Sequence, residues 1–361
     1  MSAQDAGAPT PTDKALLSVA DLRVSFATEE GVVQAVDGVS FDLAAGEVLA
    51  VVGESGSGKS VTAMTLMGLT RSPNARFEGT AHYKGTELIA ASEEELRKVR
   101  GAEIAMIFQD PMTSLNPVVK IRDQIAEQIQ EHEGVPDQQA HERCVELLER
   151  VGIPRARERA DNYPFEFSGG MRQRVMIALA LSCNPSVLIA DEPTTALDVT
   201  IQAQILQRMR ELREETGAAV ILVTHDLGVV ADFADRIAVM YSGRIVEEGT
   251  LDQIFYDPQH PYTWGLLGSI TRVDRPRPER LPAIKGLPPS LANRPEGCHF
   301  RPRCPHEFAP CLEVPPLEAR IDGQSDHRDR CWLSVEEKRE RREVRPGEIG
   351  LAAKEKEAPA A

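Results

Sequence analysis

The clearest candidate for chemistry is a glycine-rich segment near the start of the chain, Gly53-Glu54-Ser55-Gly56-Ser57-Gly58-Lys59-Ser60. It fits the phosphate-binding pattern G-x-x-x-x-G-K-[ST], between a short apolar run at 48–52 and a helical run at 62–69. Glycines let successive N–H groups face a polyphosphate, the helix dipole and Lys59 add positive charge, and Ser60 offers an oxygen to Mg²⁺. A plain Gly/Ser turn is disfavoured by this setting. The pattern defines the ligand and not the reaction.

Two adjacent carboxylates, Asp191 and Glu192, follow the apolar run at 187–190. At a strand end beside the phosphate loop, Asp191 is placed to hold Mg²⁺, usually through water. Glu192 is placed to polarise the water that attacks the γ phosphate. The alternative is a helix N-cap pair. Pro193 directly after Glu192, and the apolar run before Asp191, argue against that alternative.

A second anion site is predicted at the start of a helix over 172–181, where the sequence reads Phe167-Ser168-Gly169-Gly170-Met171. Such a site is useless to a chain that already holds ATP unless it serves the ATP of another chain. The segment therefore predicts a head-to-tail dimer with nucleotide at the interface. Taken alone, Ser-Gly-Gly before a helix is usually only a cap.

Two further polar residues indicate a function only in combination with the motifs above. His225 follows the apolar run at 219–223, where its side chain would emerge near the same sheet edge, reach the γ phosphate and orient the attacking water. A lone histidine is normally a satisfied surface or core residue. Gln109, in Ile107-Phe108-Gln109-Asp110, is similarly weak in isolation.

The elements that must position these residues can be predicted from hydrophobic patterning. Alternating segments over 17–43, with an acidic turn at 28–31, predict an antiparallel β layer. The short apolar runs at 48–52, 187–190 and 219–223, alternating with helices, predict a parallel α/β sheet. An apolar stripe over 121–152 predicts a helical insertion.

The composition narrows the class of protein. The chain has 361 residues and 42% hydrophobic residues, enough for a sizeable core. Its 41 Lys+Arg against 56 Asp+Glu give a net charge of −15, which disfavours nucleic acid as a partner. We find neither a run of about 18 apolar residues nor a secretory signal, so we expect a cytoplasmic protein without a membrane span.

The carboxyl-terminal part differs from the rest of the chain. Eleven prolines fall between 276 and 316, which places a domain boundary near residue 258. The same part holds four of the six cysteines: Cys298, Cys304, Cys311 and Cys331. A metal could replace the missing core there. A disulfide pair is disfavoured in reducing cytoplasm, zinc usually shows a C-x₂-C pair, and reduced thiols are the plain alternative. Cys144 and Cys183 are expected to be packing residues.

Taken together, these motifs resemble the ATPase cassette of ABC transporters over about residues 17–256. They occur in the order phosphate loop, glutamine loop, signature, Mg²⁺ aspartate with glutamate, Asp loop (Ala196-Leu197-Asp198) and switch histidine. The signature departs from the commonest L-S-G-G-Q at Phe167 and Met171. The resemblance implies catalysis by Glu192, His225, Lys59 and Gln109, with Ser60, Gln109 and Asp191 at Mg²⁺. It implies nucleotide contacts from Phe26, on adenine, and from Gly53, Glu54, Ser55, Gly56, Ser57, Gly58, Lys59, Ser60, Val61, Gln109, Ser168, Gly169, Gly170 and Asp198.

Several segments narrow the resemblance to the oligopeptide/dipeptide and nickel importer ATPases, extending it to about residue 333. They are Phe108 to Pro117, Phe167 to Arg174, Gly243 to Gly249 and His260 to Thr263. His260 to Tyr262 also suits a rigid X-Pro turn that packs the appendage on the cassette. The resemblance implies a sister ATPase in a heterodimer, two permease subunits, an extracytoplasmic solute-binding protein, and a peripheral location on the cytoplasmic face of the membrane. Members of this branch also make a [4Fe-4S] cluster our first choice for the four cysteines, with zinc second.

The resulting expectation is an α/β protein: an ABC ATPase cassette with an antiparallel β subdomain, a helical subdomain and a Pro/Cys-rich appendage. We expect a disordered start (1–15), the ATPase domain (16–257, helical at about 110–180), the appendage (258–335) and a disordered charged tail (336–361). The expected function is ATP hydrolysis that powers peptide import. An importer of nickel or another small solute, or a soluble ABC ATPase, is the alternative.

Overall fold

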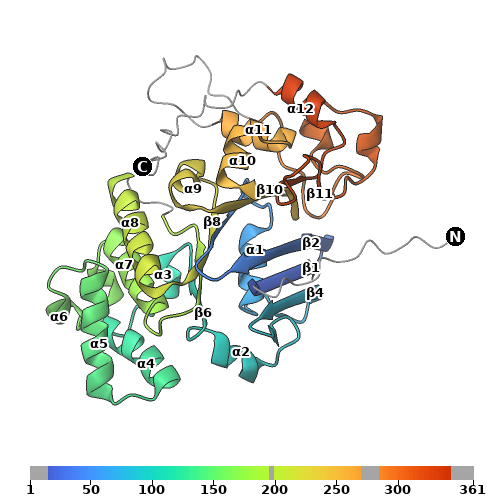
Figure 1. The fold of residues 1–361 in the computed structure, drawn as a ribbon. Helices are drawn as coiled ribbons and strands as arrows, with labels where there is room; N and C mark the ends of the chain where they lie inside the picture. Colours follow the sequence, from blue (N-terminus) through green and yellow to red (C-terminus); the bar gives the residue numbers. More distant parts are fainter. Residues whose placement is uncertain (1–14, 195–198, 270–283, 343–361) are drawn as a thin grey trace, which may run out of the picture.

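The structure is a computed structural model that describes residues 15–194, 199–269 and 284–342 (Figure 1). A four-stranded antiparallel sheet comes first, with the order β2-β1-β4-β5. Its strands are β1 (Ala15–Thr28), β2 (Gly31–Ala44), β4 (Ala75–Tyr83) and β5 (Thr86–Glu87). The hairpin of β1 and β2 closes between Thr28 and Gly31, at the predicted acidic turn. The predicted antiparallel layer is therefore confirmed.

The main sheet has eight strands among the described residues, in the order β11-β12-β10-β9-β3-β8-β7-β6. Their bounds are β3 (Val48–Val52), β6 (Ile104–Ile107), β7 (Val187–Asp191), β8 (Ala219–Thr224), β9 (Arg236–Tyr241), β10 (Arg244–Thr250), β11 (Glu318–Ala319) and β12 (Arg328–Asp329). The neighbouring pairs from β6 to β9 are parallel, and β10, β12 and β11 continue the sheet antiparallel.

The three strands predicted to be parallel, β3, β7 and β8, are confirmed as parallel, and β6 and β9 extend them. The sheet as a whole is mixed, because the edge that follows β9 is antiparallel. Only Ser242 and Gly243 separate β9 from β10, and both have positive φ, 46° and 81°. Two such residues form a tight hairpin turn, which suits antiparallel strands and is too short for a parallel crossover.

The predicted helical insertion is present on one side of the main sheet (Figure 1). It comprises α3 (Pro111–Ser114), α4 (Ile121–Glu133), α5 (Asp137–Arg150), α6 (Ala156–Arg159), the 3₁₀ turn η1 (Pro164–Glu166) and α7 (Gly169–Ala180). Ile121, Ile125 and Ile129 of α4 are fully buried, as their spacing predicts.

The remaining helices cover the main sheet or belong to the carboxyl-terminal part. They are α1 (Lys59–Leu66), α2 (Glu93–Val99), α8 (Val199–Thr216), α9 (Leu227–Phe233), α10 (Leu251–Tyr256), α11 (Pro261–Gly268), α12 (Val335–Arg341) and the 3₁₀ turns η2 (Arg301–Arg303) and η3 (Ala309–Leu312). Within the described residues the core consists of two large apolar clusters, and successive side chains of β3 alternate between them. Val48, Ala50 and Val52 belong to one cluster, and Leu49 and Val51 belong to the other.

The carboxyl-terminal region, by which we mean the described residues from 258 onward, shares the core of the cassette. Tyr262, Leu267 and Phe300 belong to the same apolar cluster as β3. β12 pairs with β10, opposing Asp329 to Glu247. The parts on either side of the domain boundary expected near residue 258 therefore share one core, and the boundary itself stays a prediction.

The expected disordered tail from residue 336 is wrong for its first residues, because 335–341 form α12. Ser334 and Glu337 form a capping box at the helix start. The side chain of Lys338 is fully buried, and its Nζ donates to Asp329 Oδ1 at 2.7 Å. This buried ion pair fixes α12 to β12, which a count of charges cannot reveal. The rest of the predicted disorder, at 1–14 and 343–361, lies outside the described residues.

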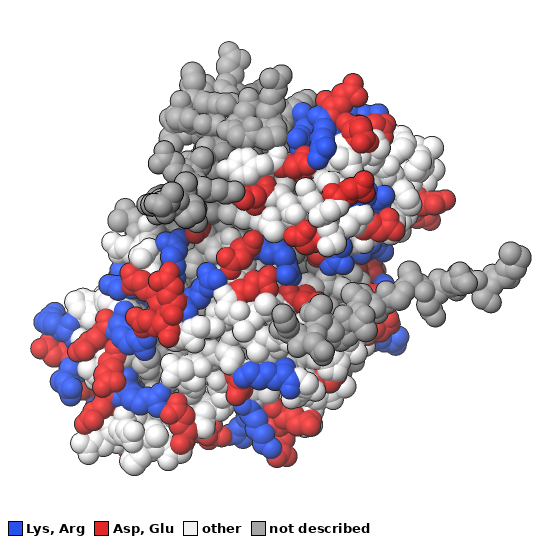
Figure 2. All heavy atoms as spheres, in the orientation of Figure 1, with Lys and Arg blue, Asp and Glu red and all other residues white. Residues whose placement is uncertain are grey.

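Two surface properties bear on function. Among the described residues, no helix has the length and apolarity needed to cross a membrane. Basic and acidic side chains are interspersed over the face in view in Figure 2 rather than gathered by sign.

Candidate functional site

The glycine-rich loop follows β3 and leads into α1, as the sequence predicts. Gly58, which precedes α1, has φ of 100°, and a Cβ there would lie 2.5 Å from the carbonyl oxygen of Ala35. Gly53 has φ of 155°, and its Cβ would lie 2.2 Å from the carbonyl oxygen of Met240. The loop therefore passes so close to neighbouring backbone that only glycine fits at both ends.

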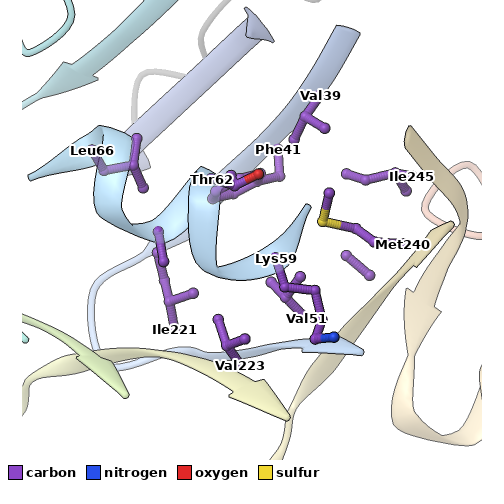
Figure 3. A pocket seen from close by; sticks show the side chains of 12 residues that line it. Val39, Phe41, Val51, Lys59, Thr62, Leu66, Ile221, Val223, Met240 and Ile245 are labelled. Atoms are coloured by element: carbon purple, nitrogen blue, oxygen red, sulfur yellow. The ribbon is translucent and has the colours of Figure 1, made fainter. Parts of the chain in front are cut away.

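Lys59 lies beneath this loop with its amine directed at the loop backbone. Its Nζ donates to the carbonyl oxygens of Gly53 at 2.7 Å and Glu54 at 3.0 Å. Burial lowers the pKa of Lys59, and the carboxylates of Glu192 and Asp191 act in the opposite direction. Figure 3 shows the side chain running from α1 towards Val51 of the sheet, at the rim of a small apolar cavity. Of the described residues that line this cavity, only Lys59 is charged. Its stem packs on apolar surface while its charge stays at the loop.

Ser60 and Asp191 meet where α1 begins and β7 ends. Ser60 Oγ donates to Asp191 Oδ1 at 2.9 Å. Burial is the main cause that raises the pKa of Asp191, and the bond from Ser60 opposes it. Two hard oxygen donors thus converge from separate segments, a donor set that fits Mg²⁺.

Glu192 follows β7 in an unusual backbone conformation. Its φ is +48°, in the left-handed region that non-glycine residues rarely adopt. Its N–H donates to the carbonyl oxygen of Val223 at 2.8 Å, which ties this turn to the end of β8. Strained residues held by their surroundings are typical of functional sites.

The carboxylate of Glu192 brings the two weaker candidates together. Gln109 Nε2 donates to one oxygen at 3.0 Å, and His225 Nδ1 lies 3.1 Å from the other. The segments that carry these residues follow β6, β7 and β8, which are adjacent parallel strands. Their carboxyl ends meet at one edge of the sheet, where parallel α/β proteins bind ligands.

Other predicted residues are placed differently. Ser168 caps α7, its Oγ accepting from Met171 N at 3.4 Å, and both Ser168 and Gly169 are exposed. In the described chain, no hydrogen bond joins residues 168–170 to the glycine-rich loop. A Cβ on Gly170 would lie 3.0 Å from Ile201 Cγ2. Phe26 and Val61 are half-buried against the core of the antiparallel sheet. Asp198 lies outside the described residues.

Two residues of the carboxyl-terminal region reach the loop, and we did not single them out for this role. Tyr262 Oη accepts from Glu54 N–H at 2.8 Å. Arg303 holds the Glu54 carboxylate with both terminal nitrogens, at 2.5 and 3.0 Å. The expected packing of His260 to Tyr262 on the cassette is confirmed, but these residues begin α11, with His260 as its N-cap, rather than forming a turn. No sequence signal pointed to Arg303.

The four clustered cysteines come from three stretches of the carboxyl-terminal region and line one cavity, together with His260, His306 and Trp332. Burial raises the pKa of Cys304 to about 11 and that of Cys331 to about 12, so these two thiols, when free, stay protonated at neutral pH. In the described ranges, no three side chains of His, Cys, Asp or Glu are grouped closely enough to hold a metal ion. Cys144 is fully buried in the core, whereas Cys183 is half-buried.

Comparison with known proteins identifies the class. The family model described as ABC transporter matches residues 36–195. The dimeric post-hydrolysis structure of the ATP-binding cassette MJ0796, bound to ADP and Pi, is similar with a TM-score of 0.59 and 29% identity, covering 65% of this chain and 98% of that one. The chain is an ATPase cassette of the ABC transporter family.

The match to the carboxyl-terminal part and the similarity to whole proteins narrow the family further. Residues 246–311 match the model described as oligopeptide/dipeptide transporter, C-terminal region. The oligopeptide transport ATP-binding protein OppD of Bacillus subtilis is 53% identical, covering 88% of each chain. OppD of Salmonella typhimurium is 51% identical, covering 91% of this chain and 97% of its own. The dipeptide transport ATP-binding protein DppD of B. subtilis is 52% identical, covering 88% of this chain and 94% of its own. The chain belongs to the ATP-binding subunits of oligopeptide/dipeptide ABC transporters, and the resemblance found in its motifs is confirmed.

Proposed function

We propose that this subunit hydrolyses ATP to power the import of oligopeptides or dipeptides across the cytoplasmic membrane. The proposal depends on one observation above all: Lys59, Ser60, Asp191 and the Gln109–Glu192–His225 group converge at one edge of the main sheet. This arrangement supplies a cation, two hard oxygen donors and an oriented carboxylate, the parts needed for phosphoryl transfer to water.

The roles of the residues follow from their chemistry. Loop N–H groups and Lys59 bind the phosphates of ATP, and Phe26 at the edge of β1 stacks on adenine. Ser60 and Asp191 would hold Mg²⁺, with Gln109 offering a third oxygen while its amide nitrogen bonds Glu192. When bound, the ion neutralises phosphate charge and fixes the substrate. Glu192 polarises the attacking water, and its bonds from Gln109 and His225 keep both carboxylate oxygens oriented.

We place Ser168, Gly169 and Gly170 in a partner's active site. Ser168 and Gly169 are exposed at the start of α7, and the similar cassette MJ0796 is dimeric by its description. A helix start that, within the described residues, makes no hydrogen bond to the glycine-rich loop of its own chain suits the γ phosphate held by another cassette. In this arrangement Asp198 would cross the dimer. We take the partner to be a sister ATPase, with two permease subunits, an extracytoplasmic binding protein and a peripheral location on the cytoplasmic face.

For the four cysteines we propose a [4Fe-4S] cluster, with zinc as the second choice. The proposal is supported by the cavity that all four cysteines line. The names of the matched families and of the relatives reported above mention no metal. A zinc ion with bonds of about 2.3 Å requires thiolates within about 4 Å of one another. Such a group is absent from the described residues, and the preference for the cluster over zinc depends on the resemblance to this branch of importers. The cluster would fasten three Pro-rich stretches together.

The metal content of the purified protein tests the cysteine proposal. Anaerobically purified protein should be brown and contain about four irons per chain. A colourless protein with stoichiometric zinc would reverse the order of the two metals. A protein with neither metal would leave only reduced thiols.

Transport by the whole complex tests the proposed function. We expect vesicles that contain the purified transporter and its binding protein to accumulate labelled oligopeptides or dipeptides only when ATP is hydrolysed. Lys59→Ala should abolish both activities, because it removes the cation at the phosphates. Uptake of Ni²⁺ without uptake of peptides would favour the nickel importers instead. ATP hydrolysis without the permease and without any uptake would favour a soluble ABC ATPase.

A further inference from the structure

The second residue of the phosphate loop, Glu54, is held at three points. Its N–H donates to Tyr262 Oη at 2.8 Å, and its carbonyl oxygen accepts from Lys59 Nζ at 3.0 Å. Its carboxylate accepts from both terminal nitrogens of Arg303, at 2.5 and 3.0 Å. Two of the three contacts come from the carboxyl-terminal region, 208 and 249 positions away in the chain.

Arg303 is itself held rigidly in a buried setting. Its side chain is only 4% exposed. Its Nε donates to the carbonyl oxygen of Lys285 at 3.0 Å, and the guanidinium carbon lies 5.8 Å from the ring centroid of Tyr241 and 6.0 Å from that of Phe300. A guanidinium that is fixed before it pairs loses little freedom when it holds a carboxylate. Arg303 therefore restrains Glu54 rather than following it.

The other end of the loop is supported by the same region through a relay. The N–H of Gly243, in the turn between β9 and β10, donates to the carbonyl oxygen of Ser57 at 2.9 Å, and its own carbonyl oxygen accepts from Asp37 N–H at 2.8 Å. The Asp37 carboxylate in turn pairs with Arg294 of the carboxyl-terminal region at 3.0 Å, and with Arg23 and Arg244 of the cassette at 2.6 and 2.8 Å. Contacts from beyond residue 258 therefore reach Glu54 directly, whereas they reach Ser57 only through Asp37, which the cassette also holds.

We propose that Arg303 and Tyr262 are positioning residues for ATP binding. They hold Glu54, and so fix the first turn of the phosphate loop in the shape that presents its N–H groups and Lys59 to the triphosphate. Neither side chain needs to touch the nucleotide. The inference rests on the proposed role of the loop in binding ATP, and it gives the carboxyl-terminal region a part in that step. Without this support the loop adopts other conformations as well, and only a fraction of the molecules can bind ATP. The apparent affinity for ATP falls by that fraction.

The test is the ATP dependence of hydrolysis by the full-length chain, assembled with its partner subunits. We expect Arg303→Met to raise the KM for ATP about tenfold while kcat changes by no more than about twofold. Arg303→Lys should recover only part of the loss, because lysine keeps the charge without the two-pronged geometry. Tyr262→Phe, which removes a single hydroxyl, should raise the KM about threefold. The dissociation constant of a fluorescent ATP analogue should follow the KM.

The control is Arg339→Met. Arg339 also forms a two-pronged pair with a carboxylate, that of Asp257, its Nη2 lying 2.6 Å from Oδ2; its side chain is 48% exposed against 4% for Arg303, and it does not contact the loop. We expect this variant to keep the wild-type KM. In a double-mutant cycle, Arg303→Met should have little further effect once Glu54→Gln is present, because both changes break the same bond.

Three outcomes decide the matter. A lowered melting temperature with an unchanged KM in Arg303→Met and Tyr262→Phe would make both residues merely structural and overturn the inference. Fully additive effects of Arg303→Met and Glu54→Gln would also contradict it, because the route through Glu54 would be wrong. The proposed function fails separately: if Lys59→Ala hydrolyses ATP normally, the loop is not the binding site at all.

Discussion

The edge of the main sheet that carries the proposed catalytic residues and the carboxyl-terminal region both contact the phosphate loop, but they reach it differently. The proposed catalytic side chains lie at or beyond the carboxyl ends of β3, β6, β7 and β8, so the topology of the parallel strands brings them to one edge. Arg303 and Tyr262 reach the loop only because a Pro-rich segment folds back over the cassette. The first group depends on local sequence and sheet topology, and the second on long-range packing. Changes in the two regions should therefore have different consequences, chemistry in one and binding or stability in the other.

The largest effect should come from breaking the catalytic side with Glu192→Gln. The amide keeps the size of the side chain and can still bond His225 or Gln109, but it cannot polarise water as a carboxylate does. We expect ATP binding to persist while kcat falls by about 10²- to 10⁴-fold. Single-turnover hydrolysis and equilibrium nucleotide binding measure the two quantities separately.

A carboxylate elsewhere provides the control for that experiment. Glu211 is exposed on α8 and pairs with Arg208 at 2.6 Å, remote from the loop contacts described above. Glu211→Gln should leave hydrolysis unchanged. Undiminished turnover in Glu192→Gln would show that Glu192 takes no part in the reaction. The proposed difference between the two regions would then no longer hold.

The next largest effect should be on stability, through the buried pair of Lys338 and Asp329. Both side chains are almost fully excluded from solvent, 0% and 2% exposed, and their charged atoms are 2.7 Å apart. Lys338→Met leaves the Asp329 carboxylate buried without its main partner, which should cost about 3–5 kcal/mol of the free energy of unfolding. Chemical denaturation of the full chain measures the loss.

A second variant separates the charge from the packing. Adding Asp329→Asn to Lys338→Met removes the uncompensated charge, so much of the lost stability should return. Equal losses in the single and the double variant would mean that packing alone is responsible. In either case the KM for ATP should change less than in Arg303→Met.

The same comparison explains how much could be predicted from the sequence. The loop at 53–60 and the pair Asp191–Glu192 could be found because each is a short motif after an apolar strand, and parallel strands must end at one edge. The contact of Arg303 with Glu54 spans 249 positions and lies in a segment without periodicity, so no local pattern predicts it. The sequence places Lys338 in the expected disordered tail, because a single charged residue gives no sign of the Asp329 with which it is buried.

The carboxyl-terminal region should lose stability at acid pH, because it contains a buried histidine at the start of α11. Burial lowers the pKa of His260 from 6.5 to about 4. Its Nδ1 accepts from Tyr262 N–H at 3.1 Å, a bond that protonation there would break. Since the folded-state pKa lies below the unfolded value, the stabilising contribution is present above pH 6.5 and is lost as the pH falls towards 4.

The expected loss is at most about 1.4 kcal/mol for each pH unit below 6.5. His260→Asn keeps a capping acceptor without a titrating ring, and it should be less stable than the wild type at pH 7.5. The difference in unfolding free energy should narrow by about 2 kcal/mol at pH 5. A difference that stays constant over this range would show that His260 is not titrating, and the acid sensitivity would have to be sought elsewhere.

The smallest expected effect tests whether the two regions unfold together, because each region contains a Ser/Glu capping box. Ser92 caps α2 in the cassette and Ser334 caps α12 in the carboxyl-terminal region, each with a glutamate three residues later. Ser92→Ala and Ser334→Ala should each cost about 1 kcal/mol. If the shared core makes the two regions one cooperative unit, both changes should lower the same single transition in calorimetry. Two separate transitions, with Ser334→Ala moving only one of them, would mean that the carboxyl-terminal region unfolds by itself. Arg303 could then leave the phosphate loop while the rest of the cassette stays folded.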